Sequence, residues 1–397
     1  MLTYYIKTFG CQANIADSNT ISGVLEALDF EEVAQVFGAN EDEIFYNTLP
    51  LADVLIINTC SVRQKSEDKV YGLGKALKRV EKETGKKPFI IMAGCMVGSV
   101  TGERQRYAFE TLKKKTPWVD SYINPSQIMT IPNILLNNSL LSDWAVQKFD
   151  SSAVLSKQDN PTHAFVNISY GCDNFCTFCV VPYARGKEVS RTQEEILKEI
   201  RHYTLRGIKE ITLCGQNVNS WGLSMSAKME IRTGSDQKIP FAELLRNVHE
   251  IKEIEKISFI SSNPFDFTND LVEALKLPKI SKYLHVAVQS GNNTVLKNMN
   301  RRHTVEDFAA LISKIKAAKP DVELGTDVIV GFPGETREQF LDTVKLFEKV
   351  KFNVAFISIY SPRKGTPAER FFKDDVPAKE KKWRHAYLTK VWRASKN

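Results

Sequence analysis

The sequence predicts an α/β protein in two parts: an N-terminal open parallel α/β sheet domain, followed by a partial (β/α)6 TIM-like barrel. Three observations predict this fold. Short apolar strands alternate with helical patterns along the chain, with short connections between them. A polar stretch without periodicity at 147–160 separates two such series and reads as a linker. The second series contains six strand–helix units, whereas eight would close a barrel.

The size and composition agree with a globular protein of this kind. The 397 residues suggest two or three domains. With 43% hydrophobic and 25% charged residues, disordered and fibrous classes are excluded. No apolar run approaches the ~18 residues of a membrane helix, and the N-terminus lacks the basic and apolar regions of a secretory signal. We therefore expect a cytoplasmic protein with no membrane partner.

Residues 1–146 supply the open sheet. Its strands are predicted at Leu2–Lys7, Asp53–Asn58 and Phe89–Ala93. A helix face follows the first strand, because Ile21, Val24, Leu25 and Leu28 recur at helical spacing. Asp17 or Ser18 is the expected cap of that helix. A charged helix is predicted from Arg63 to about Glu83, and the 31–52 connection looks longer than usual.

Three of the seven cysteines stand at equivalent places in this domain. An odd number of cysteines in a cytoplasmic chain argues against a disulfide framework. Cys11, Cys60 and Cys95 each follow one of the three predicted strands within a few residues. Ligands of open parallel sheets bind beyond the carboxyl ends of the strands. One buried cysteine is usually only a small apolar residue, but three at such positions predict convergence at one edge of the sheet.

The barrel is predicted over 161–376, with a basic helix at 377–397. Its strands are expected at Ala164–Ser169, Glu210–Cys214, Lys256–Ser261, Leu284–Val288, Glu323–Gly331 and Val354–Tyr360. Helical patterns separate these strands near 193–206, 241–252, 268–277, 304–318 and 336–350.

The strongest chemical signal follows the first barrel strand, where the chain reads CxxxCxxC at Cys172, Cys176 and Cys179. Zinc sites usually combine CxxC with a second pair of ligands. Here the next cysteine is Cys214, which we expect to be a buried free thiol. Three thiolates leave one iron of a 4Fe-4S cluster open to bind a small molecule. An iron–sulfur cluster is therefore favoured, and zinc is the alternative.

This motif, after the first strand of a partial barrel, resembles the radical S-adenosylmethionine (SAM) superfamily. The stretch Gly171–Arg191 looks like the methylthiotransferase family, which adds CH3S to an unactivated C–H bond. Lys7–Asn14 (KTFGCQAN), Asn58–Arg63 (NTCSVR) and Ala93–Met96 (AGCM) are similar to the N-terminal domain of that family. The resemblance covers nearly the whole chain, in order.

Within the family, NTCSVR and Gly215–Trp221 (GQNVNSW) resemble the branch that modifies tRNA adenosine already bearing an isopentenyl group (MiaB-type). This implies 2-methylthiolation of N6-isopentenyladenosine at position 37, next to the anticodon. The alternatives are the sister branches that act on threonylcarbamoyl-adenosine in tRNA or on an aspartate of a ribosomal protein. Two rivals from other classes are an iron–sulfur nucleic-acid-binding protein and an iron–sulfur electron carrier. Nucleic-acid binding does not account for six cysteines in two groups of three, and an electron carrier has no need of a six-unit barrel.

The resemblance also implies the cofactors. The CxxxCxxC cysteines would hold a radical-generating 4Fe-4S cluster whose open iron binds SAM. Cys11, Cys60 and Cys95 would hold an auxiliary 4Fe-4S cluster that supplies the sulfur. Two SAM molecules are consumed per turnover, one cleaved to a 5′-deoxyadenosyl radical and one as the methyl donor. The cofactors carry the chemistry, so no side chain is expected as an acid or base.

The implied partners are a tRNA anticodon stem-loop and a one-electron reductant of the flavodoxin or ferredoxin type. The sulfur donor stays open, and we expect a monomer. Candidate SAM contacts lie at the carboxyl ends of the barrel strands, where turn formation or helix capping is the alternative role for each polar residue. They are Phe178, Gly215, Gln216, Asn217, Ser261, Gln289, Ser290, Asp327 and Tyr360.

Basic charge is concentrated at the end of the chain. Residues 363–397 hold 11 Lys and Arg against 4 Asp and Glu, which equals the net charge of +7 of the whole sequence. Such a segment predicts a polyanionic partner, although a solvated helix face is the alternative. We expect the small TRAM-type RNA-binding domain of the family to be absent. Candidate RNA contacts are Arg185, Arg191, Lys379, Lys381, Lys382, Arg384, Lys390 and Arg393.

Overall fold

The computed structural model describes residues 1–62, 64–151, 154–158 and 160–395, which form two compact units. Unit 1 comprises Met1–Asp159 and Val180–Lys187, and unit 2 comprises Asn160–Cys179 and Glu188–Asn397. The predicted linker at 147–160 lies partly outside the described residues. The short segment after CxxxCxxC, expected in the barrel, belongs to unit 1. Among the described residues, no helix has the length and apolar character needed to cross a membrane.

Unit 1 is built on a five-stranded parallel sheet in the order β2-β1-β3-β4-β5. The strands are β1 (Thr3–Thr8), β2 (Glu31–Glu32), β3 (Val54–Thr59), β4 (Phe89–Gly94) and β5 (Ser121–Ile123). Every residue of β3 is buried. Helices cover both faces of such a sheet, so its central strands are continuous apolar runs.

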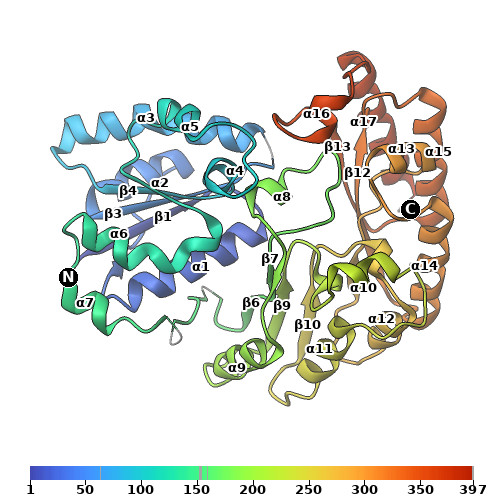
Figure 1. The fold of residues 1–397 in the computed structure, drawn as a ribbon, viewed down its shortest axis with the longest axis horizontal. Helices are drawn as coiled ribbons and strands as arrows, with labels where there is room; N and C mark the ends of the chain where they lie inside the picture. The colour runs from blue at the N-terminus through green and yellow to red at the C-terminus, as the bar shows by residue number, and fades with distance from the viewer. Residues whose placement is uncertain (63, 152–153, 159, 396–397) are drawn as a thin grey trace. The chain divides into compact units, whose positions relative to one another are not determined.

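The helices lie on both faces of this sheet (Figure 1). On one face, α1 and α6 contribute Ile21, Leu25 and Leu135 to one apolar core, and on the other α3 and α5 contribute Leu77 and Leu112 to a second. The long 31–52 connection contains β2, α2 and a 3-10 turn. The helices of unit 1 are α1 (Gln12–Glu26), α2 (Glu41–Thr48), α3 (Gln64–Thr84), α4 (Cys95–Thr101), α5 (Phe109–Lys115), α6 (Ile131–Asn137), α7 (Asp143–Lys148) and α8 (Val181–Ala184).

The start of α1 differs from the prediction. The helix begins at Gln12, and its N-cap is Cys11 rather than Asp17 or Ser18. Both predicted caps lie inside the helix and are buried. Asp17 forms an ion pair with Arg185, and the hydroxyl of Ser18 lies 2.7 Å from that of Thr8. The cap prediction is wrong because these polar groups serve tertiary contacts.

Unit 2 is a partial barrel of six parallel strands, as predicted. Two three-stranded sheets, β6-β9-β10 and β11-β12-β13, are joined by isolated parallel bridges between Ile257 and Ile280 and between Ser262 and Val286. The strands are β6 (His163–Asn167), β9 (Glu210–Cys214), β10 (Lys256–Phe259), β11 (Tyr283–His285), β12 (Glu323–Val330) and β13 (Val354–Ile359). A short antiparallel pair, β7 (Ser169–Tyr170) with β8 (Val189–Ser190), follows β6.

Helices flank the barrel strands, and a large apolar core lies between them. Three helices start with a capping box, formed by Thr192 with Glu195, Thr304 with Asp307, and Thr336 with Gln339, which satisfies their first amides. The helices of unit 2 are α9 (Gln193–Thr204), α10 (Met225–Glu230), α11 (Pro240–His249), α12 (Asn269–Ala274), α13 (Asn293–Asn298), α14 (Val305–Ala318), α15 (Arg337–Val350), α16 (Pro367–Phe371) and α17 (Ala378–Ala394).

The C-terminal helix α17 is an integral part of unit 2. It packs against β13 and α15. Leu388 is fully buried in the barrel core, and the indole of Trp392 donates to the Phe352 carbonyl at 2.9 Å. One face of α17 is therefore buried against the rest of unit 2.

Candidate metal centres

The three cysteines of unit 1 follow three neighbouring strands. In the parallel register Thr8 pairs with Asn58, and Thr59 pairs with Gly94. Cys60 and Cys95 therefore follow directly paired residues, and Cys11 stands at the start of α1, just after β1. Cys60 and Cys95 are buried, whereas Cys11 is exposed. The strand order thus brings these three sulfurs to one edge of the sheet, and we call them the first trio.

Two buried asparagines hold the loops of the first trio. The Asn14 amide donates to Asn58 Oδ1 at 3.2 Å and to the Thr59 carbonyl at 3.0 Å, and the Asn58 amide donates to the Asn14 carbonyl at 2.8 Å. Gly94, directly before Cys95, has φ +91°, which favours glycine. A Cβ there would lie 2.4 Å from Asn58 Oδ1 and from the Thr59 carbonyl. Only glycine therefore fits at this position.

A buried ion pair lies beside the first trio. Helix α8 packs on α4, so closely that a Cβ on Gly98 would lie 1.9 Å from the Ala184 carbonyl. Arg185 Nη2 and Asp17 Oδ2 are 2.6 Å apart, and the two side chains are only 5% and 3% exposed. Burial raises the pKa of the Cys95 thiol, while the charge of Arg185 lowers it. The expectation that Arg185 contacts RNA is wrong, because its guanidinium is buried and paired.

The second trio lies in the 171–179 loop of unit 2. Cys172 and Cys176 are buried, and the Cys179 amide donates to the Cys176 carbonyl at 2.9 Å. Burial raises the pKa of Cys172 well above its usual value, and the nearby Cys179 raises it further. Arg301, which the sequence did not single out, donates from Nη1 to Cys176 Sγ at 3.4 Å.

Both trios fit iron–sulfur clusters better than single ions. Among the described residues, no three or more Cys, His, Asp and Glu side chains lie close enough to share one metal ion. The ligand sulfurs of a 4Fe-4S cluster bind different irons, so they stand further apart than the ligands of one zinc ion. Burial keeps Cys95 and Cys172 protonated in the absence of metal, and coordination removes that proton. Each trio leaves one iron of such a cluster without a cysteine ligand.

Buried polar groups without partners surround the second trio. Ser169 Oγ, Asn174 Nδ2 and Arg301 Nε have no hydrogen-bond partner among the residues the structure describes. Ser169 Oγ lies against Gly215, where a Cβ would come within 2.5 Å of it. Unpaired buried polar atoms call for an explanation such as a ligand. They fit the polar groups of SAM. Sequence reasoning missed all three, including Asn174, which lies between Cys172 and Cys176.

Six of the nine predicted SAM contacts form two groups of three. Ser261 and Gln289 follow β10 and β11 with φ +67° and +74°, a conformation that is strained for non-glycine residues and clusters at functional sites. Gln216 is half-buried after β9. These placements leave the three residues as candidates for SAM contact.

Three other predicted contacts are buried within the protein. The Asn217 amide donates to Ser220 Oγ and Asp266 Oδ2 and accepts from Asn263, with Asn217 only 1% exposed. Ser290 is fully buried, and its hydroxyl accepts from the Asn292 amide. Tyr360 is buried in a small apolar cluster that Phe178 joins from its edge, and burial raises the pKa of Tyr360 to about 12. The expectation of direct SAM contact is corrected for Asn217 and Ser290, because their side chains serve turns and loop contacts.

Asp327 takes part in a chain of polar side chains on the barrel strands. His285 Nε2 lies 2.7 Å from Asp327 Oδ2, and His285 Nδ1 lies 3.1 Å from the Tyr283 hydroxyl. Asp327 is 44% exposed at its side chain, whereas its neighbours Thr326 and Val328 are buried. Asp327 is therefore accessible to a ligand, and His285 orients it.

The candidate RNA contacts divide by exposure. Lys381 is 6% exposed and pairs with Asp374, and Arg384 is 4% exposed and pairs with Glu335 at 2.8 Å. Arg191 is partly buried, with Nη1 donating to Glu199 at 2.6 Å and to the Asn167 carbonyl. The expectation of phosphate contact is wrong for Lys381 and Arg384. The remaining exposed candidates are Lys379, Lys382, Lys390 and Arg393.

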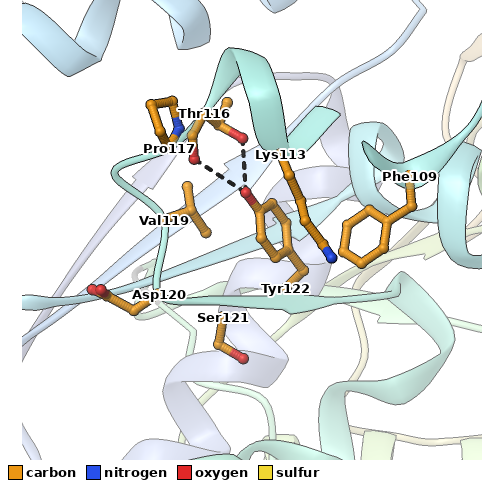
Figure 2. Close-up of a pocket in the computed structure, with 8 residues that line it drawn as sticks. All are labelled: Phe109, Lys113, Thr116, Pro117, Val119, Asp120, Ser121 and Tyr122. Atoms are coloured by element: carbon orange, nitrogen blue, oxygen red, sulfur yellow. Dashed lines mark hydrogen bonds between the residues drawn. The ribbon is translucent and has the colours of Figure 1, made fainter. Parts of the chain in front are cut away.

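A surface depression between α5 and β5 holds none of this chemistry. Figure 2 shows the Tyr122 hydroxyl hydrogen-bonded to Thr116, with Lys113 lying near the ring of Phe109. Asp120 stands at the amino end of β5, where it accepts from the Ile90 amide at 2.8 Å. The cysteines follow the carboxyl ends of the strands, so this depression is not their site.

Comparisons with known proteins agree with this geometry. Residues 3–123 match the uncharacterized protein family UPF0004, and residues 166–347 match the Radical SAM superfamily. The chain is 40% identical over 396 residues to the tRNA-2-methylthio-N(6)-dimethylallyladenosine synthase of Clostridium botulinum (strain Hall), covering 98% of this chain and 81% of the relative. The chain belongs to the family of tRNA-2-methylthio-N(6)-dimethylallyladenosine synthases.

A second synthase, from Thermoanaerobacter sp. (strain X514), is 38% identical over 375 residues, which cover 92% of this chain and 73% of that one. Among solved structures, the radical SAM methyltransferase TsrM from Kitasatospora setae has a TM-score of 0.62 at 13% identity, covering 93% of this chain and 75% of that one, and shows a likeness of fold. As a member of the synthase family the chain is an enzyme, a radical SAM methylthiotransferase whose cofactors are 4Fe-4S clusters and SAM.

Proposed function

We propose that this enzyme converts N6-isopentenyladenosine at position 37 of tRNA, next to the anticodon, to its 2-methylthio derivative. The observation that carries the proposal is the presence of two separate cysteine trios, one in the sheet unit and one in the barrel unit, in a chain of the synthase family. A single radical cluster would need only the CxxxCxxC trio. The first trio provides a place for the sulfur chemistry.

The residues of each unit would have distinct tasks. Cys172, Cys176 and Cys179 would hold the cluster that binds SAM, and the first trio would hold the auxiliary cluster. When bound, these groups supply the radical that breaks the C–H bond and the sulfur that replaces the hydrogen. The protein holds the ligand loops, through Asn14, Asn58 and Gly94 in unit 1, and buries most of the ligand cysteines away from water.

The tRNA would bind through its anticodon loop. The adenine C2 edge is inaccessible within a stacked duplex, so the target base must be splayed out of the loop. Exposed Lys382, Lys390 and Arg393 on α17 would contact phosphates. A one-electron reductant of the flavodoxin or ferredoxin type would supply the electron, to an enzyme that acts as a monomer.

Complementation provides the test of the reaction. The chain is expressed in a host that lacks the methylthio modification, and tRNA nucleosides are analysed by mass spectrometry. We expect 2-methylthio-N6-isopentenyladenosine to appear with the wild-type chain. The triple variant C172A/C176A/C179A, expressed at the same level, is the control and should give none. The proposal would be overturned if the host that expresses the wild-type chain contains the protein with both clusters but no methylthio nucleoside in its tRNA.

The choice of substrate branch needs a second test. Anticodon stem-loops that carry isopentenyladenosine, threonylcarbamoyl-adenosine or plain adenosine are compared with the reconstituted enzyme. We expect product from the isopentenyl substrate and little from the others. Comparable turnover of the threonylcarbamoyl loop would assign the chain to the sister branch.

A further inference from the structure

We infer that the buried Arg185–Asp17 pair sets the reduction potential of the auxiliary centre at Cys11, Cys60 and Cys95 through the two charges that it holds beside the ligand-bearing helices. This inference rests on the proposed function, because it needs an iron–sulfur cluster in the first trio. The pair belongs to unit 1, although Arg185 follows the CxxxCxxC loop in the sequence.

The geometry places the pair between two ligand-bearing helices. Asp17 lies in α1, whose N-cap is Cys11, and α4 begins with Cys95. Arg185 follows α8, which packs on α4. The guanidinium reaches Asp17 with both Nη atoms, at 2.6 and 3.4 Å. Its charge also lowers the pKa of the Cys95 thiol, so the pair acts on a cysteine ligand.

The burial of the pair makes its charges effective. Both side chains are at least 95% buried, so water screens them little. A buried pair costs desolvation and is weak evidence of a purely stabilising role. Charge is one of the factors that set iron–sulfur potentials. The position of the pair suits that task.

The two charges should act in opposite directions. Reduction adds one negative charge to a cluster, so the positive Arg185 favours the reduced state and the negative Asp17 disfavours it. Arg185→Gln should therefore lower the midpoint potential, and Asp17→Asn should raise it. We expect each to change the reduction equilibrium constant about tenfold, which is about 59 mV for one electron. The double variant R185Q/D17N, a neutral pair, should lie near the wild-type value.

The experiment measures the auxiliary cluster alone. The full-length chain with C172A/C176A/C179A, reconstituted with iron and sulfide, carries only the first trio. Its potential is measured by redox titration followed by electron paramagnetic resonance, with and without each substitution. Iron content and unfolding temperature are recorded for every variant. R185K should have a midpoint potential close to that of the chain with Arg185, because lysine keeps the positive charge.

Arg301 provides the matched control, because it donates to Cys176 of the other trio. R301Q should leave the potential of the auxiliary cluster unchanged. If R185Q and D17N lower the unfolding temperature but leave the potential within error, or shift it in the same direction, the pair is only structural and the inference fails. If the triple variant binds no iron at all, the proposed auxiliary centre itself fails, which is a separate result.

Discussion

The demands on single residues are strictest around the first trio, and Gly94 is the clearest case. G94A would place a Cβ against Asn58 Oδ1 and the Thr59 carbonyl at a φ of +91°. Strain of this kind costs about 1–3 kcal/mol, and the shift would displace Cys95. We expect a lower unfolding temperature and about half the iron of the wild-type enzyme.

Gly85 provides the control for this substitution. It also has a positive φ, +69°, but a Cβ there would meet nothing within 4 Å. G85A should therefore lower the unfolding temperature slightly and leave the iron content unchanged. Equal iron loss in both variants would show that the close approach at Gly94 is unimportant.

His303 gives a prediction about pH. It is 4% exposed, and burial together with the charge of Arg301 holds its pKa well below 6.5. The folded protein keeps this ring neutral, whereas the unfolded chain protonates it below pH 6.5. The contribution of neutral His303 to the free energy of unfolding is therefore fully present above pH 6.5. Below that pH the free energy of unfolding declines, by up to about 1.4 kcal/mol per pH unit. The free energy of unfolding, measured at pH 7.5 and 5.5, should fall less in H303Q than in the wild type; parallel declines would contradict this.

Residue patterns could predict the cysteine positions but not their polar neighbours. Each cysteine of the first trio follows an apolar strand, so sequence order alone placed it at a strand end. Asp17 and Arg185 are 168 positions apart, and no local pattern relates them. Arg301 and Ser169 were missed for the same reason. Their roles depend on tertiary contacts.

Among the elements, α17 combines a packing face and an exposed basic face. Arg384 pairs with buried Glu335, and breaking such a pair by removing one partner costs about 3–5 kcal/mol. R384Q should therefore lower the unfolding temperature markedly. The triple variant K382Q/K390Q/R393Q changes only exposed residues and should unfold like the wild type.

The same triple variant tests the contact with tRNA. Each phosphate contact contributes about 0.7–0.9 to the slope of log affinity against log salt concentration. Removing three contacts should flatten this slope by about two to three, as measured by fluorescence anisotropy with an anticodon stem-loop. An unchanged slope would mean that the exposed face of α17 does not bind RNA.

Elements with strong periodicity were predictable, and short ones were not. The strand β9, predicted and observed at Glu210–Cys214, is buried at every position after Glu210. The two-residue β2, the three-residue β5 and the helix α4 are too short for a period to emerge. For α17 the sequence predicted the helix and its positive charge. It could not predict which acidic residues pair with Lys381 and Arg384, because helical periodicity does not relate α17 to the segments that contain them.

At the scale of the whole molecule, the chain passes three times between the two units. A fragment of residues 1–159 would lack α8, so Asp17 would lose its cationic partner and Gly98 its neighbour. We expect this fragment to be less stable than the same fragment with residues 180–187 attached through a flexible linker, by about 3–5 kcal/mol. D17N should rescue the short fragment in part, as measured by urea unfolding. Equal stability of the two fragments would contradict the prediction.

The return of α8 to unit 1 also sets an order of events during biosynthesis. A ribosome must translate past Lys187 before the N-terminal sheet can acquire its last helix, and by then all three CxxxCxxC cysteines have been made. The first trio therefore lacks the neighbouring Arg185–Asp17 pair while the nascent chain is shorter than this. Its surroundings are complete only once both sets of cysteines have been made.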